Sequence, residues 1–129
     1  MKRFLLLWLP VFAWMGMIFV GSSIGNVPRV GGTTTDALAH RIAHILEFAV
    51  LGALVQRAMS GAGRITKREL LITLVIVAFY GASDEVHQRF TPGRSSEGIA
   101  VVFDVAGGLA GAWLYRRWRN CRQSHQATE

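Results

Sequence analysis

The 129-residue sequence has few charged residues and a single cysteine, and both shortages narrow the possible classes of protein. Charged residues make up 17% of the chain, whereas soluble domains average about 25%. Hydrophobic residues make up 51%, which excludes an intrinsically disordered or collagen-like chain. Because Cys121 has no second cysteine, an intramolecular disulfide and a cysteine-rich zinc site are both excluded. A small protein that crosses a membrane several times remains.

Long apolar runs separate the charges into clusters. The first run, from Phe4 to Ile24, holds 21 residues without a charge. At about 1.5 Å per residue, a helix of this length crosses the roughly 30 Å of a bilayer's hydrocarbon core. The run also resembles a secretory signal peptide, although it exceeds the usual apolar core of about 7 to 15 residues.

Three more apolar segments follow the first. We therefore predict an all-α fold, a four-transmembrane-helix bundle that forms one membrane domain over residues 1–129. The spans are expected at roughly 4–24, 40–57, 69–88 and 99–118.

The basic residues predict how these spans are oriented, because cytoplasmic loops hold an excess of Lys and Arg. With the N-terminus inside, ten of the fourteen basic residues lie on the cytoplasmic side, and six of the eight acids lie on the other. Both termini are therefore expected to be cytoplasmic. The basic residues after the fourth span then act as a topology signal or contact anionic lipid headgroups, and nucleic acid is not an expected partner.

The second span contains polar residues that a membrane helix usually excludes. His40, His44 and Glu47 share one face, a stripe about 60° wide on a helix that turns about 100° per residue. Glu47 lies six residues past Arg41, which places it roughly 9 Å further along the helix axis and below the headgroups. A charge at the centre of a span costs about 2.5 to 3.5 kcal/mol, so such residues usually face the bundle interior.

The third and fourth spans contain polar residues at the same expected depth. Asp84, His87 and Gln88 share a face at the end of the third span, with Glu85 beside them. Asp104 lies five residues after Ile99, roughly 7 to 8 Å into the outer half of the fourth span. We therefore predict one outward-facing pocket, whose candidate binding residues are Arg41, His44, Glu47, Asp84, Glu85, His87, Gln88, Arg94 and Asp104.

These residues also have a purely structural interpretation. The carboxylates of Glu47 and Asp104 would be neutralised by Arg41 and Arg94 in a network that only stabilises the bundle. Gln88 would make a hydrogen bond between packed helices.

The fourth span also carries small residues at helical spacing. Gly107 and Gly111 form a Gly-x-x-x-Gly motif, which is common in membrane helices. This motif predicts close packing against a neighbouring helix and says nothing about chemistry.

Two longer motifs resemble those of a known family. One is R-x-x-H-x-x-E-F, at Arg41, His44, Glu47 and Phe48, and the other is DE-x-HQ-x-F-x-PGR, from Asp84 to Arg94. Together they resemble the VanZ-like family of small bacterial integral membrane proteins, and the likeness covers nearly the whole chain. The segment IFVGSS, from Ile18 to Ser23, is similar to the serine-bearing first helix of that family. Asp104 and the two glycines fit its fourth helix.

The sequence departs from this family at one position. Family members often carry an Asp six residues after the loop arginine, which corresponds to Arg94, and this chain has Ala100 there. The role of that Asp is either missing here or transferred to a residue such as Glu97.

The resemblance implies a multi-pass protein of the bacterial cytoplasmic membrane and the cell envelope. The family takes its name from an accessory protein of glycopeptide-resistance clusters that raises teicoplanin resistance, so the resemblance implies a context and no reaction. The leading hypothesis is a binding module, in which arginine and histidine side chains hold an anionic headgroup of an envelope lipid or a lipid-linked precursor. A divalent metal would balance the acids, which outnumber the basic residues on the outward side.

Two alternatives remain open. An enzyme acting on a lipid-linked substrate would use the catalytic candidates His44, Glu47, Asp84 and His87 as acids and bases. Its site would need charge stabilisation by Arg94, with or without a metal. A small proton- or ion-coupled carrier would use the same acids and histidines as a relay, and it would require a homo-oligomer because four short helices are few for a carrier.

Overall fold

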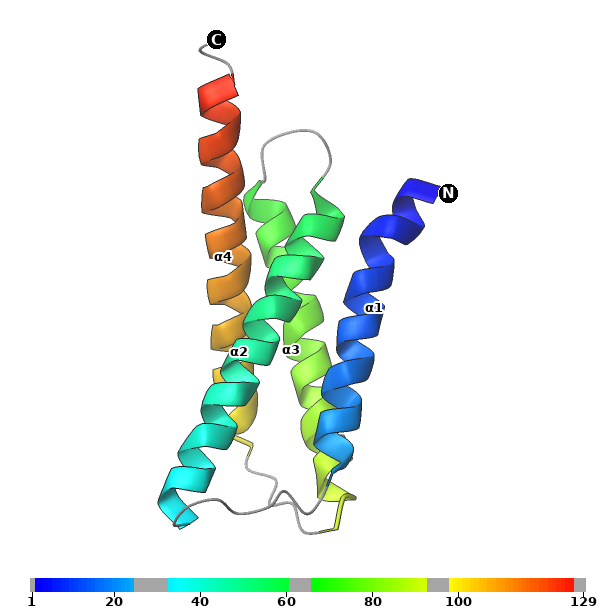
Figure 1. The fold of residues 1–129 in the computed structure, drawn as a ribbon, viewed down its shortest axis with the longest axis vertical. Helices are drawn as coiled ribbons and strands as arrows, with labels where there is room; N and C mark the ends of the chain where they lie inside the picture. Colours follow the sequence, from blue (N-terminus) through cyan, green and yellow to red (C-terminus); the bar gives the residue numbers. More distant parts are fainter. Residues whose placement is uncertain (1, 25–32, 61–65, 93–97, 127–129) are drawn as a thin grey trace.

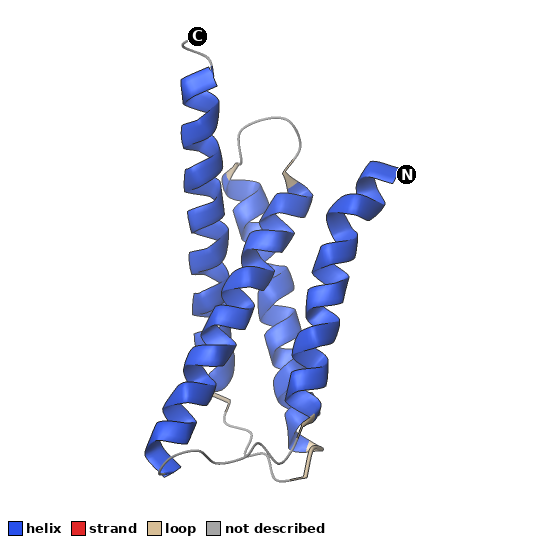
Figure 2. Ribbon diagram, viewed as in Figure 1, coloured by secondary structure: helices blue, strands red, loops and turns tan. Residues whose placement is uncertain are grey.

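The described part of the chain is built entirely from helices (Figures 1 and 2). A computed structural model describes residues 2–24, 33–60, 66–92 and 98–126. The four helices are α1 (Lys2–Ser23), α2 (Thr33–Met59), α3 (Lys67–Arg89) and α4 (Ala100–Gln126). The prediction of an all-α fold with four helices is confirmed. The second and fourth helices are longer than the predicted spans, since α2 begins before residue 40 and α4 continues beyond residue 118.

Successive helices run in opposite directions, so the two chain ends lie at the same end of the bundle (Figure 1). We call this the basal end; it also holds the end of α2 at Met59 and the start of α3 at Lys67. The opposite, distal end holds the ends of α1 and α3 and the starts of α2 and α4. α2 and α3 stand between α1 and α4, which make no contact with each other in the described part of the chain.

The helices have the length and composition of a membrane protein. Three segments, Lys2–Ser23, Leu38–Met59 and Lys67–Arg89, are long and apolar enough to cross a bilayer. Large apolar side chains such as Phe12, Leu46, Phe79 and Leu114 are exposed on the outer faces of all four helices. Lipid around the bundle would cover these faces, since soluble monomers rarely expose contiguous apolar patches of this extent.

Glycines bring α2 and α4 into backbone contact. A Cβ at Gly111 would fall on the carbonyl oxygen of Ala49, and a Cβ at Gly107 on that of Ile45. On the neighbouring face of α4, Gly108 lies against the side chain of Val77 in α3. Each approach requires a residue without a side chain. The close packing predicted from the Gly-x-x-x-Gly motif is therefore confirmed, and its main partner is α2.

The basal half of α3 is held by a cap at the start of the helix and by a side-chain contact with α2. Thr66 caps the helix and forms a capping box with Glu69, which satisfies backbone N–H groups in the first turn. Further along the helix, the Thr73 hydroxyl shares its hydrogen between the Glu69 carbonyl oxygen at 2.9 Å and the Gln56 side-chain oxygen on α2 at 3.1 Å. These contacts fix the basal half of the bundle, while the distal half is held by the polar residues described below.

Two aromatic side chains attach α1 to the rest of the bundle. Trp14 Nε1 donates to the carbonyl oxygen of Glu47 at 2.9 Å, and the Tyr80 hydroxyl donates to the carbonyl oxygen of Met15 at 2.6 Å. Removing the Tyr80 hydroxyl with Tyr80→Phe should lower the free energy of unfolding by about 1 kcal/mol, because the Met15 carbonyl loses a partly buried donor. Unfolding in mixed detergent micelles measures this change.

The matched control for this prediction is Tyr115→Phe. The Tyr115 hydroxyl makes no hydrogen bond within the described residues, so its loss should leave the free energy of unfolding within about 0.5 kcal/mol of the wild type. Equal losses in both variants would contradict the role assigned to the Tyr80 hydroxyl.

Candidate functional site

Polar side chains from all four helices gather at the distal end of the bundle. α1 contributes its last two residues, Ser22 and Ser23, and α2 contributes residues from its distal half. α3 contributes its last turns, and α4 contributes Asp104 from its second turn. Several are buried among apolar helices: Ser22, His44, Asp84, Glu85, Gln88 and Asp104. Buried polar groups are costly without partners, so their contacts decide what this cluster can do.

Asp84 is the centre of a buried network between α1 and α3. Its residue exposure is 3%, and its Oδ2 accepts the Ser22 hydroxyl at 2.9 Å and Gln88 Nε2 at 2.8 Å. Gln88 Nε2 also lies 3.4 Å from the Ser22 hydroxyl oxygen. Because Gln88 follows Asp84 by four residues on one helix face, the pair is set by local geometry, and Ser22 joins it only through packing. Both donors act on the same carboxylate oxygen.

His44 and Asp104 form a second buried contact, between α2 and α4. His44 Nδ1 lies 3.4 Å from Asp104 Oδ1, within ion-pair distance, yet the two atoms do not have hydrogen-bond geometry. The imidazole of His44 is held on both sides by rings. His40 meets it edge-on with centroids 4.6 Å apart, and Phe48 stacks on it at 6.3 Å. The histidine is thus oriented by packing, and it keeps one ring nitrogen close to a carboxylate.

The two contacts belong to one electrostatic cluster. Gly81, one turn before Asp84 on α3, leaves a gap in which a Cβ would stand 3.8 Å from Asp104 Oδ2. The Asp104 carboxylate of α4 therefore packs against α3 near Asp84. His44 is within electrostatic range of Asp84 and Glu47 as well as Asp104. The structure therefore brings together His44, Glu47, Asp84 and Asp104, which the sequence assigned to three different spans.

His87 lies beside this cluster, against the end of α1. Its Nε2 is 3.0 Å from the Ser23 hydroxyl oxygen, and its ring stacks on Phe19 with centroids 4.3 Å apart. The Ser23 hydroxyl donates its hydrogen to the carbonyl oxygen of Phe19 at 2.7 Å. A hydroxyl has one hydrogen, so when this hydrogen is on the Phe19 carbonyl, the Nε2–H tautomer of His87 donates to the Ser23 oxygen.

The remaining candidates have different positions. Glu85 is buried and Glu47 is half-buried, and each has an interaction partner. Arg41 is exposed, with its guanidinium carbon 5.7 Å from the centre of the Phe103 ring. The predicted neutralisation of acids by Arg94 and the predicted role of Glu97 concern residues outside the described part of the chain. Ala100 begins α4, four residues before Asp104 and on the same face.

Three buried atoms in this cluster lack a hydrogen-bond partner within the described residues. They are His44 Nδ1, Asp84 Oδ1 and Asp104 Oδ1. Leaving a buried polar atom unsatisfied costs about 1 to 3 kcal/mol, so each of them is a position where a ligand donor would be stabilised. No group of three or more His, Cys, Asp or Glu side chains among the described residues has an arrangement that could hold a metal ion.

Ser22 and Ser23 are the functional neighbours that sequence reasoning left out of the site. Both stand at the end of an apolar run, where small hydroxyl residues are also typical of a signal-peptide cleavage region. Their expected depth in the membrane could have identified them. Because successive helices alternate in direction, the first and third spans end on the same side of the membrane. Two adjacent hydroxyls at that level match the two polar residues Asp84 and His87 that they contact.

A comparison with protein families agrees with the motifs on which this cluster is built. The model described as VanZ/LLP1 matches residues 6–119, a range that includes every described residue of the cluster. The chain belongs to the VanZ/LLP1 family. Neither the curated proteins nor the solved structures gave a match.

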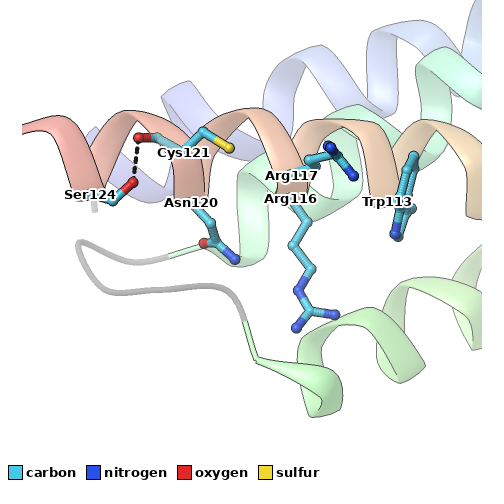
Figure 3. Close-up of a pocket in the computed structure, with 6 residues that line it drawn as sticks. All are labelled: Trp113, Arg116, Arg117, Asn120, Cys121 and Ser124. Atoms are coloured by element: carbon cyan, nitrogen blue, oxygen red, sulfur yellow. Dashed lines mark hydrogen bonds between the residues drawn. The ribbon is translucent and has the colours of Figure 1, made fainter.

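The basal end has a separate hollow of about 410 Å³ on one face of α4 (Figure 3). Its lining residues are Trp113, Arg116, Arg117, Asn120, Cys121 and Ser124. All of them belong to one helix, and the guanidinium of Arg117 lies over the Trp113 ring at 5.6 Å. Cys121 is an exposed free cysteine, as its solitary occurrence predicts. This hollow shares no residue with the distal cluster.

Proposed function

We propose that this VanZ/LLP1 protein binds the headgroup of an envelope lipid at the distal end of its bundle, from the outer side of the bacterial cytoplasmic membrane. In this proposal all four helices span the bilayer and both termini are cytoplasmic. The apolar part of α4 covers residues 100–115, and its one acid, Asp104, is buried against α2 and α3 rather than facing lipid. The excess of basic residues at the basal end supports this orientation.

Two carboxylate oxygens without a hydrogen-bond partner within the described residues, Asp84 Oδ1 and Asp104 Oδ1, carry the proposal, and the second of them lies 3.4 Å from His44 Nδ1. Carboxylate oxygens only accept hydrogen bonds, so the interior of the cluster is suited to N–H or O–H donors. Basic side chains lie at the distal margin, including Arg89 at the end of α3. A headgroup with a phosphate at this margin and an ammonium or hydroxyl group inside the cluster would bind both the basic side chains and the carboxylate oxygens. Phosphatidylethanolamine has both a phosphate and an ammonium with N–H donors, whereas the quaternary ammonium of phosphatidylcholine has no N–H donor.

The test is native mass spectrometry of the purified full-length protein titrated with each of these two lipids. The wild type should bind phosphatidylethanolamine more tightly than phosphatidylcholine. Asp84→Asn, which places an amide where the carboxylate stood, should weaken phosphatidylethanolamine binding about tenfold, because hydrogen bonds to charged groups contribute about 1.5 to 3 kcal/mol. Phosphatidylcholine binding should be unchanged.

Gln56→Met is the matched control. Gln56 is buried in the basal half, and its loss breaks the Thr73 contact without touching the distal cluster. This variant should bind both lipids as the wild type does. Equal binding of the two lipids by the wild type, or the same loss in Gln56→Met and Asp84→Asn, would contradict the proposed site.

The family context gives this binding a proposed physiological setting, which is teicoplanin resistance. In a susceptible bacterial host, production of the wild type should raise the teicoplanin concentration that inhibits growth, and production of Asp84→Asn should not. Comparable membrane levels of the two proteins, measured by immunoblot, are needed for this comparison.

An enzyme acting on a lipid-linked substrate is the second candidate, and one contact favours it. His44 is held next to the Asp104 carboxylate, and such pairing orients an imidazole for proton transfer. Incubation of the purified protein with a polyprenyl phosphate substrate tests this candidate. Product formation that depends on His44 would favour the enzyme, and binding without product would favour the binding module.

A further inference from the structure

An apolar groove of about 460 Å³ runs between α2 and α4 on the outer surface of the bundle. From α2 it is lined by Ala49 and Ala53 among others, and from α4 by Leu114, Tyr115 and Trp118 together with Gly111. The groove arises where the backbones of Ala49 and Gly111 meet, because the two residues are too small to fill the surface above their contact. Its lining is almost entirely apolar.

The groove covers part of the depth of one leaflet of a bilayer. On α2 its lining runs from Leu46 to Ala53, which is roughly 10 Å at about 1.5 Å per residue. The same face of α2 continues for four more residues to Arg57 at the basal end. An acyl chain of the leaflet at the basal end, which spans about half of the roughly 30 Å hydrocarbon core, would lie along it.

Two arginines lie where the groove reaches the basal end. Arg57 follows Ala53 by four residues on the same face of α2. The guanidinium carbon of Arg122 stands 4.5 Å from the centre of the Trp118 ring, which lines the groove. Since α2 and α4 run in the same direction and Ala49 opposes Gly111, Arg57 lies about level with residue 119, so the two arginines lie at similar levels along the bundle (Figure 1). Neither forms an ion pair within the part of the chain that the structure describes.

We infer that this groove binds an anionic phospholipid of the leaflet at the basal end, with one acyl chain between α2 and α4 and the phosphate at Arg57 and Arg122. The planar guanidinium group forms two parallel hydrogen bonds with phosphate oxygens. Trp118 lies at the boundary between the acyl chain and the headgroup of the lipid. This is the level at which tryptophan is enriched in membrane proteins. This site is at the opposite end from the proposed headgroup site, and it does not depend on that proposal.

The other face of α4 provides a matched comparison. Arg116 and Arg117 lie at the same level of the helix as the groove's basal end, beside Trp113 (Figure 3). They carry the same two charges, but neither residue lines the apolar groove between α2 and α4. Electrostatic attraction alone would make the two pairs of arginines equivalent, whereas the groove makes only Arg57 and Arg122 part of a lipid site.

The experiment is a titration of the purified full-length protein with phosphatidylglycerol or phosphatidylcholine, followed by native mass spectrometry. The wild type should bind one phosphatidylglycerol in preference to phosphatidylcholine. Arg57→Gln/Arg122→Gln should weaken phosphatidylglycerol binding about thirtyfold, since each of the two basic residues near an anionic surface contributes on the order of 1 kcal/mol. Arg116→Gln/Arg117→Gln, with the same loss of charge, should bind as the wild type does.

A second pair of variants tests the apolar part of the groove. Ala53→Phe fills the groove and should weaken the binding of both lipids, while Ala110→Phe adds the same ring on an exposed part of α4 outside the groove and should have no effect. Equal losses in the two arginine double variants would overturn the site in favour of unspecific attraction. A shift from dimer to monomer in Ala53→Phe, with phosphatidylglycerol binding unchanged, would assign the groove to a second copy of the chain.

Discussion

Gly107→Ala/Gly111→Ala is expected to destabilise the bundle by about 2 to 6 kcal/mol, because overpacking at each site costs about 1 to 3 kcal/mol. Each new methyl group would fall on a backbone carbonyl of α2, where no side-chain rotation can relieve the clash. The two helices would have to separate, and the His44–Asp104 contact between them would lengthen. Unfolding in mixed micelles, followed by tryptophan fluorescence, measures the loss.

The control for this variant is Gly16→Ala/Gly21→Ala in α1. A Cβ at either position meets nothing within 4 Å. Replacing glycine by alanine inside a helix usually stabilises it by about 0.5 to 1 kcal/mol, so the control should shift stability in the opposite direction. If both double variants were destabilised equally, the α4 glycines would be needed for some reason other than close packing.

Asp104→Leu is expected to lower the free energy of unfolding by about 3 kcal/mol or more, because removing one partner of a buried pair leaves the other uncompensated. His44 is buried beside Asp104 Oδ1, and its Nδ1 has no hydrogen-bond partner among the described residues. The double variant His44→Leu/Asp104→Leu should recover most of this loss, since an apolar pair of similar volume is often as stable as a buried ion pair.

A double-mutant cycle of these variants separates stability from function. We expect a coupling free energy of at least about 1 kcal/mol between positions 44 and 104. The double variant should also fail to bind phosphatidylethanolamine at the distal end, although it folds. A coupling near zero would show that the 3.4 Å approach of the two side chains does not stabilise the protein. Normal lipid binding by the double variant would remove this pair from the proposed site.

The apolar runs and the positions of the polar residues determined much of this protein in advance. Four apolar runs separated by clusters of charge predicted four helices with alternating directions, although the second and third runs are shorter than the roughly 20 residues of a span and needed polar residues within the membrane zone. Alternation also places the end of one span at the level of the start of the next. For this reason the shared level of His44, Asp84 and Asp104 could be predicted from their distances to the loops, without knowledge of which helices touch.

Tertiary packing alone decided which of these residues meet. Asp84 takes its donors from α1 and from its own helix, and Asp104 meets His44 of α2, although all of these side chains lie at one level. The rotation of each helix about its own axis decides which of these side chains come into contact. A single sequence does not specify this rotation. Ser22 and Ser23 were missed for the same reason, because a hydroxyl at a span's end is informative only when its neighbour is known.

The Gly-x-x-x-Gly motif illustrates the same division. Its spacing predicted a close helix contact, because a face without side chains is stable in a bilayer only when another backbone covers it. The structure decided that this backbone is α2, with Ala49 against Gly111, and the small residues at that contact line the apolar groove between the two helices. The spacing of small residues along a helix determines how closely another helix can approach that face. The packing of whole helix faces against one another determines which helix lies there.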